Sequence, residues 1–254
     1  MLGKRKIAAL VAEFLGTGLL TLLILSVQRS TIGVPFFVAM IAGLATVAMV
    51  FALSDVSGAY LNPAVTLALW TARKLSTLRA VVLIAMELLG AWVAYYVYTY
   101  LVNTHLSNIG GHFSGRTLTA EAIGAGIIGL AWAAASFNKW NKGLTAAAAG
   151  VSYMLAMVVA STAGIGIANP AVALGIRSWV WGTYVLGPLI GTVVIVNLYG
   201  LLFAEGNPLG LKLKAATSAV KASASSTSSS AKTTAAKKKS PAKKSSSSNR
   251  SKKR

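Results

Sequence analysis

The tripeptide Asn62-Pro63-Ala64 recurs as Asn169-Pro170-Ala171 in the second half of the chain. Asn is a favoured N-cap residue of helices, and Pro is favoured at the first helical position. Each copy therefore predicts the start of a short helix, the first ending near Arg73 and the second near Trp179. Roughly ten residues reach about 15 Å, which is half the hydrocarbon core of a bilayer. We expect two re-entrant half-helices that enter a membrane without crossing it.

Long apolar segments surround both copies of the tripeptide. Apolar residues make up 55% of the chain and charged residues 11%, whereas soluble proteins have about 25% charged residues. A stretch of about 20 apolar residues is long enough to span a bilayer as a helix. The sequence therefore predicts an all-α membrane protein with six transmembrane helices, at about residues 7–27, 34–54, 78–102, 119–137, 144–163 and 182–203.

The tripeptides belong to a longer internal repeat. Ala12-Glu13-Phe14-Leu15-Gly16 aligns with Ala120-Glu121-Ala122-Ile123-Gly124, at nearly the same offset as the two tripeptides. The two halves, about residues 7–102 and 119–203, contain three predicted spans each. Because three is an odd number, the second half enters the membrane from the opposite side, as in inverted repeats. We therefore expect the two half-helices to meet near the middle of the membrane.

Such a meeting point has a definite chemistry. The N-terminus of each half-helix carries the positive end of a helix dipole, which repels cations. The side-chain amides of Asn62 and Asn169 can donate hydrogen bonds to a neutral solute. The Gly-bearing segments before them, residues 57–61 and 163–168, suit an extended backbone that lines a lumen. The pattern predicts a pore that passes small neutral molecules and excludes ions.

The basic residues are unevenly distributed along the chain. The formal net charge is +19, and 13 of the 24 Lys and Arg residues follow Glu205. Within residues 1–205, bases cluster at the N-terminus, before the third span and between the fourth and fifth spans. Cytoplasmic loops of membrane proteins are enriched in bases, so both termini are predicted to be cytoplasmic. The sequence does not indicate which membrane holds the protein.

Residues 206–254 form a separate region rich in Lys, Ser and Ala. This composition provides too few apolar residues for a core and predicts a disordered cytoplasmic tail. A run of bases beside a membrane attracts anionic lipids, which we favour over a nucleic-acid partner. Residues 1–205 are then the channel domain.

At this point the chain resembles an aquaporin, a member of the major intrinsic protein family, over about residues 5–204. The resemblance implies a bundle of six helices with two half-helices, a pore in each protomer and a homotetramer. It rests on Ala12-Glu13-Phe14-Leu15-Gly16-Thr17, on Ser57-Gly58-Ala59-Tyr60-Leu61-Asn62-Pro63-Ala64-Val65-Thr66, on Asn169-Pro170-Ala171 and on Gly187-Pro188-Leu189-Ile190-Gly191.

The chain departs from this family at the outer selectivity filter. The family usually has Arg three residues after the second Asn of the motif, where this chain has Val172. The His of water-selective members falls at Met157, the aromatic residue of the second helix at Ala42, and the fourth filter position near Gly166. The resemblance therefore implies an outer filter that is apolar and wider than usual. Glycerol, urea and ammonia become candidate solutes beside water.

Glu13 and Glu121 are acidic residues at equivalent places inside predicted spans. An ionisable group inside a membrane is a candidate functional residue, and a proton relay is one interpretation. The family resemblance implies another, in which each carboxylate accepts hydrogen bonds from the loop before a half-helix. We favour this support role.

Two function hypotheses follow. The first is a passive channel for water and small neutral solutes. The second is a non-conducting structural or adhesion protein on the same fold. An enzyme is not expected, because no nucleophile with a base and no cluster of metal ligands occurs in the sequence. We accordingly expect neither a cofactor nor a metal.

Overall fold

The computed structural model describes residues 3–204 and residue 218. Within this part of the chain, six helical spans are long and apolar enough to cross a membrane, as the sequence predicted. The predicted tail, residues 206–254, lies outside the described residues except for residue 218. The spans are α1 (Lys4–Gln28), α2 (Pro35–Leu53), α4 (Thr77–Val102), α5 (Gly115–Asn138), α6 (Lys142–Ala160) and Trp181–Phe203, in which a π-helical turn, η1 (Trp181–Val185), leads into α8 (Leu186–Phe203).

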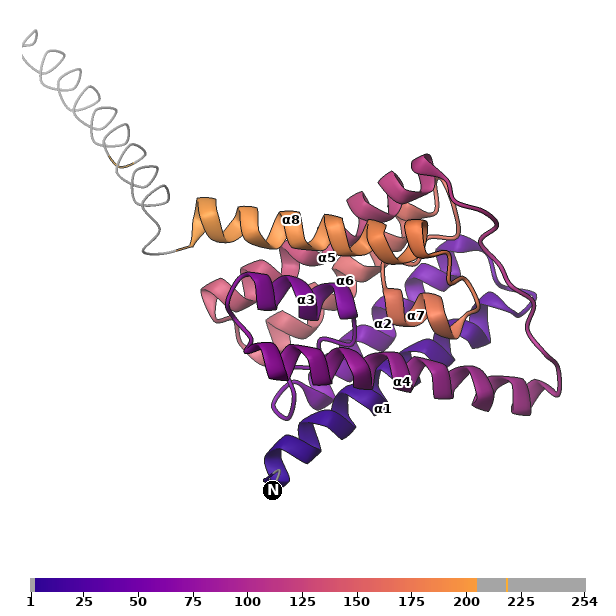
Figure 1. Ribbon diagram of the computed structural model, residues 1–254, viewed down its shortest axis with the longest axis horizontal. Helices are drawn as coiled ribbons and strands as arrows, with labels where there is room; N and C mark the ends of the chain where they lie inside the picture. Colours follow the sequence, from indigo (N-terminus) through magenta and orange to yellow (C-terminus); the bar gives the residue numbers. More distant parts are fainter. Residues whose placement is uncertain (1–2, 205–217, 219–254) are drawn as a thin grey trace, which may run out of the picture. The chain divides into compact units, whose positions relative to one another are not determined.

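Two short helices lie among the long ones. They are α3 (Pro63–Thr71) and α7 (Pro170–Gly175), and each begins at the Pro of a repeated tripeptide. Figure 1 shows both within the bundle, surrounded by the six longer spans. Because a helix rises only about 1.5 Å per residue, neither is long enough to cross a bilayer. The predicted half-helices are therefore present.

The packing of the helices follows the internal repeat. In the first half α1 packs against α4, and in the second half α5 packs against α8 in the same way. The two halves meet where α2 packs against α6. Each half-helix also packs against the last helix of the opposite half, α3 against α8 and α7 against α4. The halves are thus interlocked, and the site between them is built by both.

Glycines allow the long helices to approach closely at equivalent points. A Cβ atom at Gly90 would collide with the Phe14 carbonyl oxygen, and one at Gly191 would collide with that of Ala122. Phe14 and Ala122 are aligned positions of the internal repeat. Small residues at such crossings maximise van der Waals contact between helices in a membrane. The repeat thus holds the α1–α4 and α5–α8 pairs together in the same way.

The second half-helix is shorter than the sequence indicated. We expected a helix from Asn169 to about Trp179, but α7 ends at Gly175. Arg177 adopts a left-handed conformation with φ 67°, and Ser178 N–H donates to Ala173 O at 2.9 Å. This is a Schellman ending, which stops a helix by satisfying its last carbonyl groups. The sequence did not indicate this helix ending, because Schellman endings normally have Gly or Asn at the left-handed position.

Candidate functional site

The two repeated Asn residues cap their helices in the same way. The Asn62 Oδ1 atom accepts a hydrogen bond from Ala64 N–H at 2.9 Å, and Asn169 Oδ1 accepts one from Ala171 N–H at 3.0 Å. In each case the cap residue has an extended backbone, followed by Pro at the first helical position. The sequence pattern therefore acts locally as expected.

The same two side chains also form hydrogen bonds to the backbone of the opposite half of the chain. Asn62 Nδ2 donates to Ala168 O at 3.0 Å, and Asn169 Nδ2 donates to Leu61 O at 2.8 Å. Each acceptor is the residue just before the opposite Asn. The N-termini of α3 and α7 therefore meet. Since an amide nitrogen carries two hydrogens, each Asn keeps one N–H beyond this cross-link.

The loops before the half-helices are held by buried carboxylates. Glu13 accepts hydrogen bonds from Tyr60 N–H at 3.1 Å and from Leu61 N–H at 2.9 Å. The equivalent bonds in the other half run to Glu121. Both glutamates have no exposed surface. This geometry places them where the predicted support role requires.

These bonds hold a backbone that is strained. Leu61 and Ala168 have φ values of 54° and 52°, in the left-handed region that residues with a Cβ atom rarely adopt. Ile167 and Ala168 donate their N–H groups to Glu121 at 2.8 and 2.6 Å. Strained backbone persists only where its surroundings fix it, and it concentrates at functional sites. The carboxylates supply that constraint beside both Asn residues.

A third buried carboxylate occurs in the first half only. Glu87 on α4 is fully buried and accepts a hydrogen bond from the Thr66 hydroxyl at 2.6 Å. Its other oxygen, Oε2, has no hydrogen-bond partner. The aligned position in the second half is Pro188. Glu87 therefore has no counterpart in the second half. It contacts α3 through Thr66, one helical turn after Asn62.

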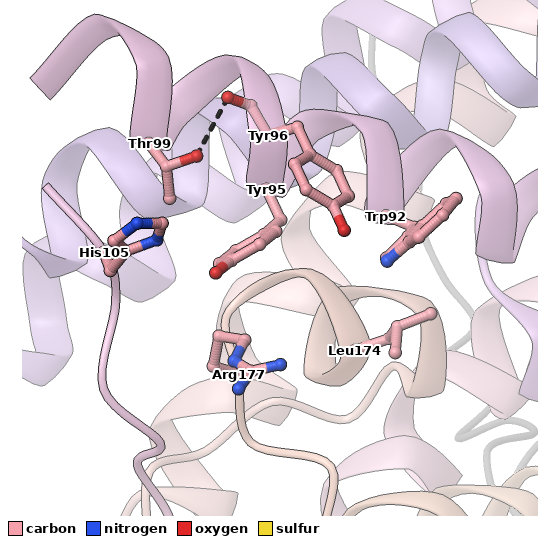
Figure 2. A pocket seen from close by; sticks show the side chains of 7 residues that line it. All are labelled: Trp92, Tyr95, Tyr96, Thr99, His105, Leu174 and Arg177. Atoms are coloured by element: carbon pink, nitrogen blue, oxygen red, sulfur yellow. Dashed lines mark hydrogen bonds between the residues drawn. The ribbon is translucent and has the colours of Figure 1, made fainter. Parts of the chain in front are cut away.

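Arg177 is the first base after the second tripeptide, and it lies at the surface. Its guanidinium group is 5.4 Å from the centre of the Tyr95 ring. Figure 2 shows it facing α4 across a hollow. Arg177 therefore does not occupy the filter position at Val172, which is fully buried. The hollow has a volume of about 290 Å³ and is lined by Trp92, Tyr95, Tyr96, Thr99, His105, Leu174 and Arg177.

His105 lies in this hollow, and His112 belongs to the same connecting loop. Among residues 3–204 and 218, no group of three or more potential metal ligands comes together.

A small cavity adjoins the meeting point of the half-helices. Its volume is about 10 Å³, which is room for about one water molecule. Among its lining residues, Tyr60 and Trp132 form an edge-to-face pair with ring centres 5.3 Å apart. Both Asn residues of the tripeptides also line it. The other lining residues are Leu20, Thr46, Leu61, Ile128, Ala149 and Tyr153.

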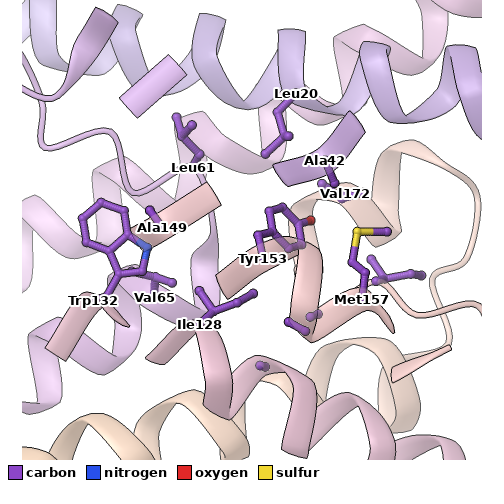
Figure 3. Packing of buried hydrophobic residues seen from close by; sticks show 14 of the residues in the cluster. Leu20, Ala42, Leu61, Val65, Ile128, Trp132, Ala149, Tyr153, Met157 and Val172 are labelled. Carbon is purple, nitrogen blue, oxygen red and sulfur yellow. The ribbon is translucent and has the colours of Figure 1, made fainter. Parts of the chain in front are cut away.

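The predicted filter residues come together, but they are packed tightly. Ala42 and Val172 have no exposed surface, and Met157 is 4% exposed. All three belong to the buried hydrophobic cluster of Figure 3, and a Cβ atom at Gly166 would collide with the Met157 carbonyl oxygen. The cluster is apolar, as expected. The extra width of the filter stays a prediction, and the long Met157 side chain belongs to the same buried cluster.

Sequence reasoning missed Tyr153. It lies on α6 one helical turn before Met157, so both side chains project from the same face of the helix. It is also separated from Thr46 by the same offset as the two tripeptides, and both residues line the small cavity. Extending the repeat offset from the tripeptides to α2 and α6 would have found it.

Comparison with known proteins gives a consistent result. The family described as Major intrinsic protein matches residues 3–199 of the chain. Aquaporin A of Dictyostelium discoideum is 30% identical over 182 residues, covering 65% of this chain and 65% of that protein. Aquaporin Z of Photorhabdus laumondii is 25% identical over 226 residues, covering 77% of this chain and 97% of that protein. The chain thus spans just under two thirds of the Dictyostelium relative.

A solved structure shows the same fold. The aquaglyceroporin of Plasmodium falciparum superposes with a TM-score of 0.63 and 21% sequence identity. The match covers 76% of this chain and 95% of that protein. At this identity the likeness establishes the arrangement of the helices.

Proposed function

The chain belongs to the major intrinsic protein family, and we propose that it is a passive membrane channel for water and small neutral solutes. Members of the family are passive channels, so the prediction that the chain is not an enzyme is confirmed. The observation that carries the proposal is the cross-linked Asn pair at the meeting point of the half-helices.

The Asn pair supports neutral selectivity for a physical reason. One N–H of each side chain remains available to a solute, so Asn62 and Asn169 can replace part of a water molecule's hydrogen bonding. An ion entering the same place would exchange its full hydration shell for a few amide donors. The N-termini of α3 and α7 also present positive dipole ends, which oppose cations. Glu13 and Glu121 serve as the supports that hold the donors in place.

Orientation and assembly complete the proposal. Because six spans are an even number of crossings, both termini lie on the same side of the membrane. The distribution of bases supports the cytoplasmic side for both. The outer faces of the spans are apolar, including Leu15, Phe51, Val93, Ile123 and Val194. Such faces suit lipid or neighbouring protomers, in keeping with a homotetramer in which each protomer has its own pore. The Lys-rich residues 206–254 are proposed to contact anionic lipid.

A second candidate is a non-conducting structural or adhesion protein. The observation that favours it is the small lumen, with room for about one water molecule beside the Asn pair. The burial of Ala42, Met157 and Val172 points the same way.

Osmotic assays on proteoliposomes separate the two candidates. Vesicles with the full chain should shrink faster than protein-free vesicles after an osmotic step. Asn169→Ala should lower this rate, because it removes the cap and one pore donor. Asn141→Ala is the matched control, since Asn141 caps the exposed start of α6. Equal shrinkage of wild-type and protein-free vesicles in tests of water, glycerol and urea would establish the non-conducting alternative.

A further inference from the structure

We propose that Tyr153 determines the size selectivity of the pore, its ring restricting the lumen to water-sized solutes and its hydroxyl binding the solute beside Asn169. This inference rests on the proposed channel function and deepens it. According to this inference, solute size is selected at Tyr153, beside the meeting point of the half-helices, and not at the outer filter.

The first argument is the location of the ring. Tyr153 lines the same cavity as Asn62 and Asn169, and it is only 3% exposed. Figure 3 shows its ring near Ile128 and Ala149, which line the same cavity. The cavity has about 10 Å³ of free space. With the Tyr153 ring in place, the remaining free space is too small for a three-carbon polyol.

The second argument is the unsatisfied hydroxyl. A buried Tyr hydroxyl usually finds a hydrogen-bond partner. The Tyr153 hydroxyl lies close enough to the Asn169 side chain to interact with it electrostatically, but it has no hydrogen-bond partner in the structure. A water molecule in the cavity would supply the missing partner. The Tyr153 hydroxyl therefore adds a third polar group, beside the two Asn amides, to which a solute in the cavity can hydrogen-bond.

The third argument is the residue at the equivalent position of the first half. Thr46 on α2 is the repeat equivalent of Tyr153, and it lines the same cavity. Its hydroxyl already donates to Ala42 O at 2.8 Å. The Thr side chain is much smaller than a Tyr ring, so Thr46 takes up less of this cavity than Tyr153 does. The narrowing thus comes from the second half of the repeat.

Met157 is a weaker barrier than Tyr153. A Met side chain is unbranched and flexible, so it adapts to a passing molecule. The Tyr ring is rigid, and it belongs to the same buried cluster as Ile128 and Ala149, which also line the cavity. Removing the ring should therefore change solute size selectivity even while Met157 remains.

The test compares water and glycerol permeability in proteoliposomes of the full chain. Tyr153→Ala should raise glycerol permeability about tenfold or more, the change that a barrier lower by about 1.4 kcal/mol produces. Tyr153→Phe keeps the ring and should leave glycerol permeability unchanged. It should lower water permeability about fivefold, the effect of one lost hydrogen bond. Met154→Ala is the matched control, because Met154 is the next residue on α6 and packs towards Gly43 of α2.

The outcomes separate this inference from the channel proposal. A wild-type protein that conducts water, with an unchanged glycerol-to-water ratio in Tyr153→Ala, overturns the inference and leaves the channel standing. An equal rise in Met154→Ala also overturns it, since general loosening would then explain the result. A wild type that conducts no solute, together with a Tyr153→Ala variant that conducts, overturns both the channel proposal and this inference, because Tyr153 would then close the pore instead of selecting solutes by size. Tyr153→Phe retains the ring, so it tests the hydroxyl even if Tyr153→Ala does not fold.

Discussion

The two halves of the molecule share the same backbone arrangement and differ in the side chains that occupy equivalent positions. In both, a carboxylate on the first helix holds the loop, an Asn caps the half-helix, and an Arg in the left-handed conformation follows its end. Three of the differences between the halves lie near the meeting point of the half-helices or in the half-helices themselves. The first half has Thr46, the nine-residue α3 and Glu87, where the second has Tyr153, the six-residue α7 and Pro188.

This difference separates two tasks. The equivalent residues build the meeting point of the half-helices, because a reciprocal bond such as Asn62 to Ala168 needs the same geometry on both sides. We propose that the unequal residues determine which solutes pass, since a lumen shared by two halves can be narrowed from one side alone. The equivalent residues therefore maintain the architecture, and in our proposal the unequal residues supply the selectivity.

The largest expected effect comes from removing a loop carboxylate. Glu121→Ala leaves two buried backbone N–H groups without an acceptor, which costs about 3 kcal/mol or more. We expect a large drop in the thermal unfolding midpoint in detergent and loss of transport. Glu13→Ala should be equally harmful if the halves are equivalent. A Glu13→Ala protein that unfolds near the wild-type temperature would break the comparison.

A smaller effect is expected at Glu87, which has no counterpart in the second half. Glu87→Ala removes the acceptor of the Thr66 hydroxyl and leaves a cavity, so we expect a loss of about 2 kcal/mol. Glu87→Gln keeps an acceptor oxygen and should stay within about 1 kcal/mol of wild type. Unfolding midpoints of both variants provide the measurement. Equal losses in the two would show that the carboxylate itself is required.

The Arg residues after the half-helices sharpen the comparison further. Arg73 and Arg177 have φ values of 59° and 67°. Replacing either with Gly removes a cost of about 1 kcal/mol for the left-handed conformation. Arg177→Gly also loses the contact with Tyr95, worth about 0.5 kcal/mol, so it should stabilise less than Arg73→Gly. Matching gains in unfolding midpoint would mean that the Tyr95 contact contributes nothing.

The smallest effect is expected at the exposed ion pair of Lys142 and Asp55, whose atoms lie 2.6 Å apart. The Asp55 side chain is 71% exposed, so solvent screens the attraction. Asp55→Asn should change stability by less than about 0.5 kcal/mol at moderate salt. The variant therefore serves as a baseline for the others. A loss comparable to that of Glu87→Ala would show that the ion pair has a larger structural role.

The sequence alone predicted the architecture well, because its signals are local. The apolar stretches predicted six spans, and the Asn-Pro pairs predicted where α3 and α7 begin. The repeat offset predicted that Asn62 and Asn169 share one site. The end of α7 could not be predicted, because Arg177 takes a conformation that its residue type disfavours.

By itself, the sequence determined the half-helices, the inverted repeat and the family, since these depend on spacing and on which residues cap helices. Only the tertiary structure decided how wide the lumen is. Width depends on how side chains from different helices pack, and the same residues at the filter positions fit a wide or a narrow gate. Here Met157 packs among Ala42 and Val172, and Tyr153 narrows the cavity beside the Asn pair.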